Sequence, residues 1–392
     1  MTKLNLKDID LKNKRVLIRV DFNVPLDENL KITDDTRIKE SLPTINYCLE
    51  QGSKVILMSH IGRPKGKIVS EFSLNPVSIR LSELLGKKVI MAKDCVGDEI
   101  KELVNEMKSG EIILLENLRF HIEEEKNEKE FALQLSLLGD ILINDAFGIA
   151  HRAHASNVGV ANFLPAVSGF LLIKEIKYLD EAINNPKRPF TAILGGSKIS
   201  GKIDVIKNLL DKVDNLLIGG AMAYTFLKAQ DKEIGNSKIE QEKILLAKEI
   251  LQEASKKKVN FILPEDHIVV SEIKENAEIK EVKEIPFNSI AVDIGKETVK
   301  KFKEILINSK TVVWNGPMGI FEMKNFQTGT FEIAKMLSEI DAITIVGGGD
   351  SVAAVNQAGY SHKITHISTG GGASLEYLEG KILPGIACLK DF

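Results

Sequence analysis

Short apolar runs alternate with amphipathic stretches along the first half of the chain. The apolar runs are typical of buried strands, and we predict strands at 15–20, 54–59, 88–91, 111–116 and 141–144. Amphipathic segments lie between them, for example at 43–51 and 76–85. Such alternation favours βαβ units, in which a parallel sheet carries helices on both faces.

A second series of the same kind follows a long helical pattern. Residues 169–184 have a helical period, and two prolines in the stretch 185–189 end it, so we predict an interdomain helix and a domain boundary there. Strands are then expected at 190–194, 216–220, 261–264, 311–314, 343–346 and 364–367. The Lys/Glu-rich stretch 238–258 is interpreted as a helix with a solvated face. The pattern predicts an α/β protein with two parallel sheets.

Polar side chains follow the predicted strands of the first half, where an open α/β sheet binds its ligands. They are Asp21 and Asn23, His60 and Arg63, Asn117 and Arg119, then Asp145, His151, Arg152 and His154, with Arg37 in a nearby loop. Only eight of the 52 basic residues are arginine, and none follows Arg188. Because a guanidinium binds carboxylate or phosphate bidentately, we predict a pocket for a small polyanion, best a phosphorylated carboxylic acid. The alternative is a set of unrelated surface arginines in ion pairs.

Glycine-rich turns dominate the second half. The stretch ILGGSKISGKID places Gly196, Gly201 and Lys202 in the spacing of a phosphate-binding loop, but Ile203 stands where Ser or Thr would bind Mg²⁺. Farther on, glycine triplets at 347–349 and 370–372 each follow an apolar run and precede a helical stretch. Backbone amides at such helix starts bind phosphate, so we predict a phosphate-binding surface; tight turns with solvated lysines are the alternative.

Composition excludes several classes of partner. A formal net charge of −3 gives no general attraction to nucleic acid or to an anionic membrane. The three cysteines (48, 95 and 388) are far apart and indicate neither a disulfide framework nor a zinc site, so we expect a cytoplasmic protein. His151 and His154 have a metal-like spacing, but the cation of Arg152 between them argues against a metal there.

Taken together, the motifs resemble the phosphoglycerate kinase family over nearly the whole chain. The residues that carry the resemblance are RVDFNVP (19–25), TDDTRI (33–38), SHIGRP (59–64), LENLRF (115–120), NDAFGIAHRAHAS (144–156), LGGSKISGKI (194–203), VVWNGPMGIFE (312–322), VGGGDS (346–351) and HISTGGGASLEYLEGKILPG (366–385). The resemblance implies a two-lobed α/β enzyme, each lobe a doubly wound parallel sheet flanked by helices and joined to the other by a hinge helix. It further implies Mg²⁺-dependent phosphoryl transfer between 1,3-bisphosphoglycerate and ADP, giving 3-phosphoglycerate and ATP.

The same resemblance implies a domain plan and a set of site residues. The lobes are expected at 1–168 (phosphoglycerate) and 190–374 (nucleotide), with the interdomain helix and hinge at 169–189 and a segment, 375–392, that returns toward the first lobe. Phosphoglycerate contacts are expected from Asp21, Asn23, Arg37, His60, Arg63, Arg119 and Arg152. Nucleotide contacts are expected from Gly196, Lys198, Lys202, Asn315, Glu322, Gly349, Asp350 and Ser351, with Asp350 as the Mg²⁺ ligand. Arg37, Lys198 and the amides of Gly371 and Gly372 are the expected catalytic groups, in a protein expected to be a monomer.

Three positions depart from the pattern associated with the family. Ile149 stands where Thr or Ser is usual, Gly201 where Asp is frequent, and Ala221 where Gly is usual. None of them removes an assigned charge, so the departures bear on affinity rather than on the class of reaction.

The alternative functions are a catalytically silent binding module for a nucleotide or phosphometabolite, and a P-loop-like ATPase. A dinucleotide dehydrogenase is disfavoured because neither triplet gives G-x-G-x-x-G.

Overall fold

The computed structural model describes residues 3–391, which divide into two compact units. Unit 1 contains residues up to Ile176 together with the stretch from Ile382 onward, and unit 2 is Lys177–Lys381. The chain passes from unit 1 to unit 2 within the long helix α6 (Phe170–Asn184). It returns after Lys381, so the C-terminal stretch is part of unit 1.

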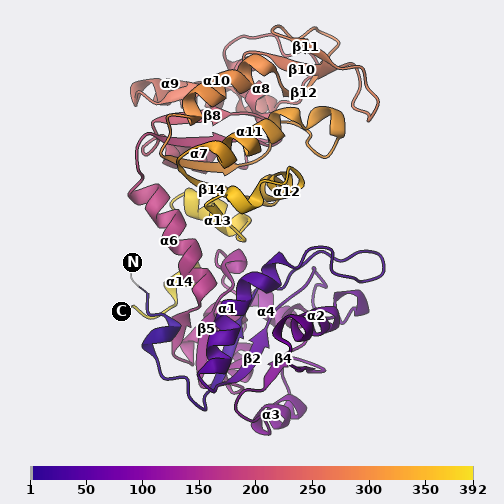
Figure 1. Ribbon diagram of the computed structural model, residues 1–392, viewed down its shortest axis with the longest axis vertical. Helices are drawn as coiled ribbons and strands as arrows, with labels where there is room; N and C mark the ends of the chain where they lie inside the picture. The colour runs from indigo at the N-terminus through magenta and orange to yellow at the C-terminus, as the bar shows by residue number, and fades with distance from the viewer. Residues whose placement is uncertain (1–2, 392) are drawn as a thin grey trace. The chain divides into compact units, whose positions relative to one another are not determined.

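Unit 1 is built on a six-stranded parallel sheet (Figure 1). Its strands are β1 (Arg15–Arg19), β2 (Lys54–Met58), β3 (Val89–Met91), β4 (Ile112–Leu114), β5 (Ile141–Asn144) and β6 (Ala166–Ser168), in the order β3-β4-β2-β1-β5-β6. Ile18 of β1 pairs with Leu57 on one side and with Ile143 on the other. The carboxyl ends of β4, β2, β1 and β5 therefore lie next to one another at one edge, from which the predicted anion-binding loops emerge.

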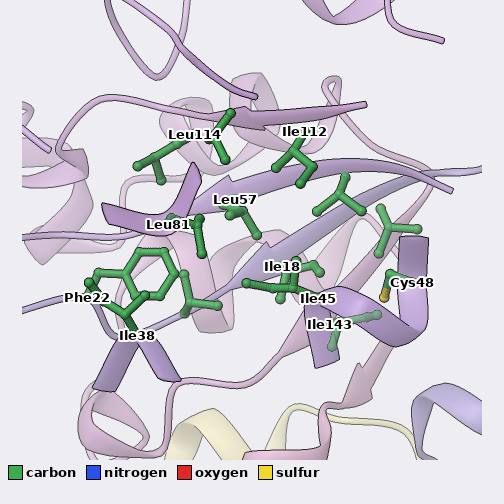
Figure 2. Packing of buried hydrophobic residues seen from close by; sticks show 14 of the residues in the cluster. Ile18, Phe22, Ile38, Ile45, Cys48, Leu57, Leu81, Ile112, Leu114 and Ile143 are labelled. Carbon is green, nitrogen blue, oxygen red and sulfur yellow. The ribbon is translucent and has the colours of Figure 1, made fainter. Parts of the chain in front are cut away.

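Helices of unit 1 cover the sheet with apolar faces. They are α1 (Thr36–Glu50), α2 (Asn75–Leu85), α3 (Asp98–Asn105), α4 (Ile122–Lys126) and α5 (Lys129–Ser136), with short helical turns η1 (Leu6–Asp8), η2 (Ser70–Phe72), η3 (Leu118–Phe120), η4 (Phe147–Ile149), η5 (Ala155–Gly159) and η6 (Val160–Asn162). Figure 2 shows Ile45 and Cys48 of α1 beside Ile18 and Ile143 of the sheet. Each such buried aliphatic side chain contributes about 1.5–3 kcal/mol. The apolar core thus holds the sheet and helices from which the polar loops project.

The C-terminal stretch is fastened to unit 1 by backbone and side-chain hydrogen bonds. Gly385, in helix α14 (Pro384–Ala387), donates from its amide to Ala150 O at 2.8 Å and accepts from Asn144 Nδ2 at 2.8 Å. Lys390 accepts at its carbonyl from the amide of Leu4 at 3.0 Å, which ties the two ends of the chain together (Figure 1). A Cβ at Gly385 would lie 2.9 Å from Ala150 Cα, so glycine permits this close approach.

Unit 2 repeats the parallel-sheet plan. Its strands are β7 (Phe190–Leu194), β8 (Asn215–Ile218), β9 (Asn260–Ile262), β13 (Thr311–Asn315), β14 (Ile343–Gly347) and β15 (His366–Ile367), in the order β15-β14-β13-β7-β8-β9. Its helices are α7 (Ile203–Leu209), α8 (Met222–Ala229), α9 (Ile244–Lys256), α10 (Lys296–Leu306), α11 (Thr328–Glu339), α12 (Gly349–Gln357) and α13 (Gly372–Leu378), with η7 (Gln241–Lys243), η8 (Lys324–Phe326) and η9 (Ser361–Lys363). The two parallel sheets confirm the predicted α/β class.

Two features of unit 2 differ from the sequence prediction. A three-stranded antiparallel sheet has the order β11 (Lys280–Val282), β10 (His267–Val270), β12 (Ile290–Ile294) and was not predicted. Its strands β10 and β12 are largely buried apolar runs that the prediction omitted, and β11 is short, charged and mostly exposed. The helix expected over 238–258 begins only at Ile244. The preceding residues are held by other contacts: Glu240 accepts from the amide of Ser200 at 2.9 Å and donates its own amide to Thr225 Oγ1 at 3.2 Å.

Among the described residues, none of the helices combines the length and apolar character needed to cross a membrane.

Candidate active site

The predicted polyanion-binding residues of unit 1 stand on loops after adjacent strands. Asp21 and Asn23 follow β1, His60 and Arg63 follow β2, Arg119 is in η3 after β4, and Arg152 follows η4 after β5; Arg37 is in the first turn of α1. Their order along the sheet edge follows the strand order, which explains how residues so far apart in sequence reach one region. We call these seven residues the basic rim.

Contacts made by members of the basic rim link its loops. Arg37 Nη1 lies 2.6 Å from Asp21 Oδ2, in an ion pair whose carboxylate is 7% exposed. Asn23 Oδ1 accepts from the amide of Gly62 at 2.9 Å, and Arg119 Nη1 donates to the carbonyl of the same glycine at 3.0 Å. The loops after β1, β2 and β4 are therefore joined, while Arg63 is exposed.

His60 is fixed in one tautomer by a buried arginine outside the predicted set. Arg19 Nη2 lies 3.1 Å from His60 Nδ1, and both side chains are buried. A guanidinium only donates, so Nδ1 accepts and a neutral imidazole carries its proton on Nε2. Burial and then the charge of Arg19 hold the pKa of His60 well below 6.5. His60 is consequently a neutral donor through Nε2.

A buried carboxylate supports this arginine. Arg19 Nε donates to Ser156 Oγ at 2.8 Å, and Ser156 Oγ donates to Glu124 Oε1 at 2.6 Å. The amide of Ser156 also donates to Glu124, at 2.9 Å. Burial lowers the pKa of Arg19 to about 10 and raises that of Glu124, although each charge favours the other. Glu124, Ser156, Arg19 and His60 form one continuous chain of hydrogen bonds.

Positive charge accumulates where Arg119 and Arg152 approach. Burial lowers the pKa of Arg119, Glu125 opposes that shift at 3.3 Å, and the nearby charge of Arg152 lowers it further. Arg152 donates from Nε to His151 Nε2 at 3.2 Å, so this nitrogen of His151 is not available to a metal ion shared with His154. Neighbouring cations of this kind are stabilised by a bound anion.

The predicted phosphate-binding turns of unit 2 also lie at carboxyl ends of strands. Gly196 and Lys198 follow β7, Asn315 ends β13, and Gly349, Asp350 and Ser351 begin α12 directly after β14. Gly348 has φ +89°, a conformation that other residues rarely adopt, and a Cβ there would lie 2.9 Å from Asn315 Nδ2. Gly371 and Gly372 occupy the N-cap and first position of α13.

Lys202 and Ser351 brace the turn after β13. Lys202, at the N-cap of α7, donates from Nζ to Asn315 O at 2.7 Å and to Asn315 Oδ1 at 2.5 Å. Ser351 is fully buried, and its Oγ accepts from the amide of Gly316 at 2.5 Å. Burial lowers the pKa of Lys202 to about 7, and Asp350 opposes that shift. Lys202 and Asn315 are thus brought together, while Ser351 contacts the protein rather than an open surface.

A cavity of about 410 Å³ opens beside these turns. Its lining includes three predicted residues, Gly196, Glu322 and Asp350, together with Ala221, one of the three atypical positions. Apolar groups such as Ile290, Val292 and Met318 form much of the remaining wall. Lys198 is exposed. Such a cavity suits a nucleotide. Its apolar wall can bury the base, and its two carboxylates can accept hydrogen bonds from ribose hydroxyls or bind a metal ion.

Sequence reasoning missed several residues of these sites. Arg19 stands in the quoted motif RVDFNVP and is one of only eight arginines, a signal that could have been used. Ser156 ends the motif NDAFGIAHRAHAS and so had a similar signal. Glu124 gave no signal, because its role arises from a contact with Ser156, 32 residues away. Lys238 was assigned to a solvated helix but lies before α9 and lines the cavity with Tyr224.

Comparison with known proteins gives one consistent result. The family model described as phosphoglycerate kinase matches residues 6–381. Phosphoglycerate kinase of Chlorobium chlorochromatii is 56% identical over 397 residues, and that of Moorella thermoacetica is 55% identical over 393; in both cases all of each chain is covered.

Solved structures agree with the sequence comparisons. Phosphoglycerate kinase from Coxiella burnetii has a TM-score of 0.89 with 41% identity, and that from Pyrococcus horikoshii has a TM-score of 0.83 with 35% identity. Each comparison covers 98% of both chains.

Proposed function

This chain belongs to the phosphoglycerate kinase family and is a kinase, and we propose that the two clusters described above bind the two substrates of one reaction. The reaction is reversible phosphoryl transfer between 1,3-bisphosphoglycerate and ADP, which gives 3-phosphoglycerate and ATP. The basic rim of unit 1 binds the phosphoglycerate, and the cavity and glycine turns of unit 2 bind the nucleotide. The observation that carries this assignment is that the loops after β1, β2 and β4, which hold most of the basic rim, are adjacent and joined by hydrogen bonds of Asn23 and Arg119 to Gly62, with Arg37 paired to Asp21 beside them.

The chemistry of the basic rim suits 3-phosphoglycerate. The acid carries a phosphate and a carboxylate, and planar guanidinium groups bind both bidentately. Asp21 holds Arg37 in place through an ion pair. Its carboxylate does not pair with the anionic groups of the acid, because like charges repel. His60 adds a neutral donor and so binds the acid without a proton uptake of its own.

The chemistry of unit 2 suits a nucleotide. Glu322 offers carboxylate oxygens for ribose hydroxyls, and the apolar wall accepts the base. Lys198, Lys202 and the amides at the starts of α12 and α13 surround the phosphates, for which helix N-termini and ammonium groups are the usual ligands. Asn315, Gly349 and Ser351 shape the turns that present these groups.

Asp350 is the residue proposed to hold Mg²⁺. Its exposed carboxylate lines the same cavity as Gly196, and hard oxygen ligands with room for water and phosphate are what Mg²⁺ prefers. When bound, the metal neutralises charge on the nucleotide phosphates. No other step is assigned to it.

Direct transfer between the substrates needs no nucleophile from the protein. In the direction of ATP use, a carboxylate oxygen of 3-phosphoglycerate attacks the γ-phosphorus and ADP leaves. The transition state spreads negative charge over three oxygens, so positioned cations and amides carry most of the catalysis. We assign this role to Arg37, Lys198 and the amides of Gly371 and Gly372. Because transfer occurs at bonding distance, the acid and the nucleotide must be brought together during the cycle.

Neither alternative function is favoured. A P-loop ATPase would leave the basic rim without a purpose, and Ile203 begins α7 where that motif needs a hydroxyl. A catalytically silent module would need no charged group beyond those that bind its ligand, whereas the chain keeps the cations Arg37 and Lys198 and the carboxylate of Asp350.

A coupled assay tests the function. The purified protein is supplied with 3-phosphoglycerate, MgATP and excess glyceraldehyde-3-phosphate dehydrogenase, and NADH oxidation is followed while each component is omitted in turn. The expected signal requires 3-phosphoglycerate, ATP and Mg²⁺ together. Absence of signal with ATP binding retained in calorimetry would support the silent module, whereas ATP hydrolysis without 3-phosphoglycerate would support the ATPase.

A further inference from the structure

A carboxylate, a thiol and an imidazole converge in unit 1 among residues to which no catalytic role is assigned. Asp94 and Cys95 lie in the loop after β3, and His121 lies between η3 and α4. His121 Nε2 is 2.6 Å from Asp94 Oδ1, and one ligand atom from each of the three residues lies within 4.8 Å of the others. Within residues 3–391 this is the group of side chains that meets the spacing required for holding a metal ion.

The ligand types and distances point to a specific class of ion. Carboxylate, thiolate and imidazole are the ligands that Zn²⁺ takes, with bonds of about 2.0–2.3 Å in tetrahedral geometry. Such bonds separate neighbouring ligand atoms by about 3.3–3.8 Å. The Asp94–His121 pair, now at 2.6 Å, must therefore open by about an ångström, and separations that now reach at most 4.8 Å must close by about 1.5 Å at most. We propose that Asp94, Cys95 and His121 form a binding site for Zn²⁺ or a similar borderline divalent cation.

The surroundings hold the ligands and still leave access for the ion. Cys95 is fully buried, and its backbone amide donates to Asp94 Oδ1 at 2.6 Å, which fixes the Asp94 carboxylate relative to the backbone that carries Cys95. The His121 ring packs against Phe131 at a centroid distance of 5.2 Å. The side chains of His121 and Asp94 are 28% and 42% exposed, so an ion can enter from that side and complete its coordination with water. Two anionic ligands would balance its charge.

Binding requires an exchange of protons. Burial, and then the charge of Asp94, raises the pKa of the Cys95 thiol well above 9.0, so the free protein holds the S–H proton. Formation of the metal–sulfur bond releases that proton to buffer. His121 binds through the Nε2 lone pair, so a proton on that nitrogen passes to Nδ1 or to buffer. Measured affinity therefore rises with pH.

Sequence spacing could not reveal this cluster. Cys95 and His121 are separated by α3 and β4 along the chain, and neither belongs to a CxxC or HxxxH pattern. The parallel pairing of β3 with β4 brings the loop after one strand beside the segment after the other. The bound ion would join these two segments and stabilise unit 1.

The test uses the full chain, freed of metal with a chelator and then titrated with Zn²⁺ or Co²⁺. One equivalent of Zn²⁺ should bind in calorimetry, and Co²⁺ should produce a thiolate-to-cobalt charge-transfer band in the near ultraviolet. Cys95→Ser should abolish the band and weaken Zn²⁺ binding at least tenfold. His121→Gln should weaken Zn²⁺ binding by at least the same factor. Cys388→Ser, which removes a partly exposed thiol elsewhere in unit 1, is the matched control and should change neither.

A measurement on the unmutated protein guards against misfolded variants. Addition of one equivalent of Zn²⁺ should shift the ¹⁵N resonance of His121 Nε2, and the same concentration of Mg²⁺ should not, because Mg²⁺ prefers oxygen ligands. A wild-type protein that binds no Zn²⁺, an unshifted His121 resonance, or a band that depends on Cys388 would each overturn the proposal. None of these readouts depends on kinase activity, so their outcome leaves the proposed function untouched.

Discussion

Arg19 donates a hydrogen bond from Nη2 to Nδ1 of His60 across 3.1 Å, with both side chains buried at the carboxyl ends of β1 and β2. The contact converts a titratable histidine into a neutral donor of fixed orientation. It also places a buried cation behind the basic rim, where Glu124 offsets its charge through Ser156. The supporting network and the residues proposed to touch the acid are thus physically continuous.

His60 is expected to stay neutral across the interval around pH 6.5. Burial and Arg19 lower its folded-state pKa, so the unfolded chain takes up a proton first as the pH falls, and the folded ring does not. In metal-free buffer, its ¹⁵N resonances should show the Nε2–H tautomer and remain constant through pH 6.5. His121, whose pKa is raised by Asp94, is the internal reference and should titrate above 6.5. A His60 resonance that titrates near 6.5 would contradict the assignment.

Removal of a proposed catalytic cation should reduce turnover far more than stability. Arg37→Ala and Lys198→Ala are each expected to lower kcat by about a hundredfold or more, the loss typical of removing a group that stabilises transition-state charge. The unfolding midpoint of Lys198→Ala should change little, since Lys198 is exposed. That of Arg37→Ala should fall modestly, because the 7% exposed carboxylate of Asp21 loses its partner. Arg80→Ala removes an arginine that pairs with Asp35 outside the basic rim and is the matched control. Normal rates in both test variants would contradict the catalytic roles assigned to Arg37 and Lys198.

Ser156 is expected to matter for the acid and not for the nucleotide. Ser156→Ala breaks the link between Glu124 and Arg19, so the KM for 3-phosphoglycerate should rise about tenfold, which corresponds to about 1.4 kcal/mol. The KM for MgATP at saturating acid should not change. Ser78→Ala removes another buried serine hydroxyl of unit 1, one that donates to Asn75 O, and should leave both constants as they are. An equal rise in both constants for Ser156→Ala would indicate a general structural effect instead.

Nucleotide affinity should fall as the pH rises above about 7. Burial lowers the pKa of Lys202 to about 7, and only its protonated form attracts phosphate. Above that value, binding must take up a proton, so the Kd for MgATP should rise by at most tenfold per pH unit. Calorimetry between pH 7 and 9 in two buffers of different ionisation enthalpy measures both the affinity and the proton uptake. Lys202→Met should remove this dependence; a flat wild-type profile would show that Lys202 does not titrate there.

Periodicity predicted the parallel sheets well because their strands are continuous apolar runs bounded by turns. The helix expected at 169–184 is observed as Phe170–Asn184, with prolines that end it. In the antiparallel sheet, His267–Val270 and Ile290–Ile294 are apolar runs that the prediction omitted, whereas Lys280–Val282 carries charged side chains and little apolar pattern. Local composition does not show which backbone groups a distant strand will pair.

The candidate site was likewise only partly predictable from the sequence. Arg37, His60 and Arg119 could be proposed from sequence because functional side chains follow strands and arginine is rare in this chain. Glu124 could not, because a glutamate in a Glu-rich stretch looks solvated, and only the tertiary fold buries it against Ser156. Lys238 was missed for a related reason: its lysine-rich neighbours suggested a helix face, whereas hydrogen bonds of Glu240 draw the segment away from the helix.

Direct transfer between the two substrates is tested most directly by the stereochemistry at phosphorus. ATP made chiral at the γ-phosphorus with ¹⁶O, ¹⁷O and ¹⁸O is used to phosphorylate 3-phosphoglycerate, and the configuration of the transferred group is determined by ³¹P NMR after trapping. A single in-line displacement predicts inversion. Retention would require two displacements through a phosphorylated protein side chain, and would contradict the assignment of Arg37, Lys198 and the glycine amides as purely stabilising groups.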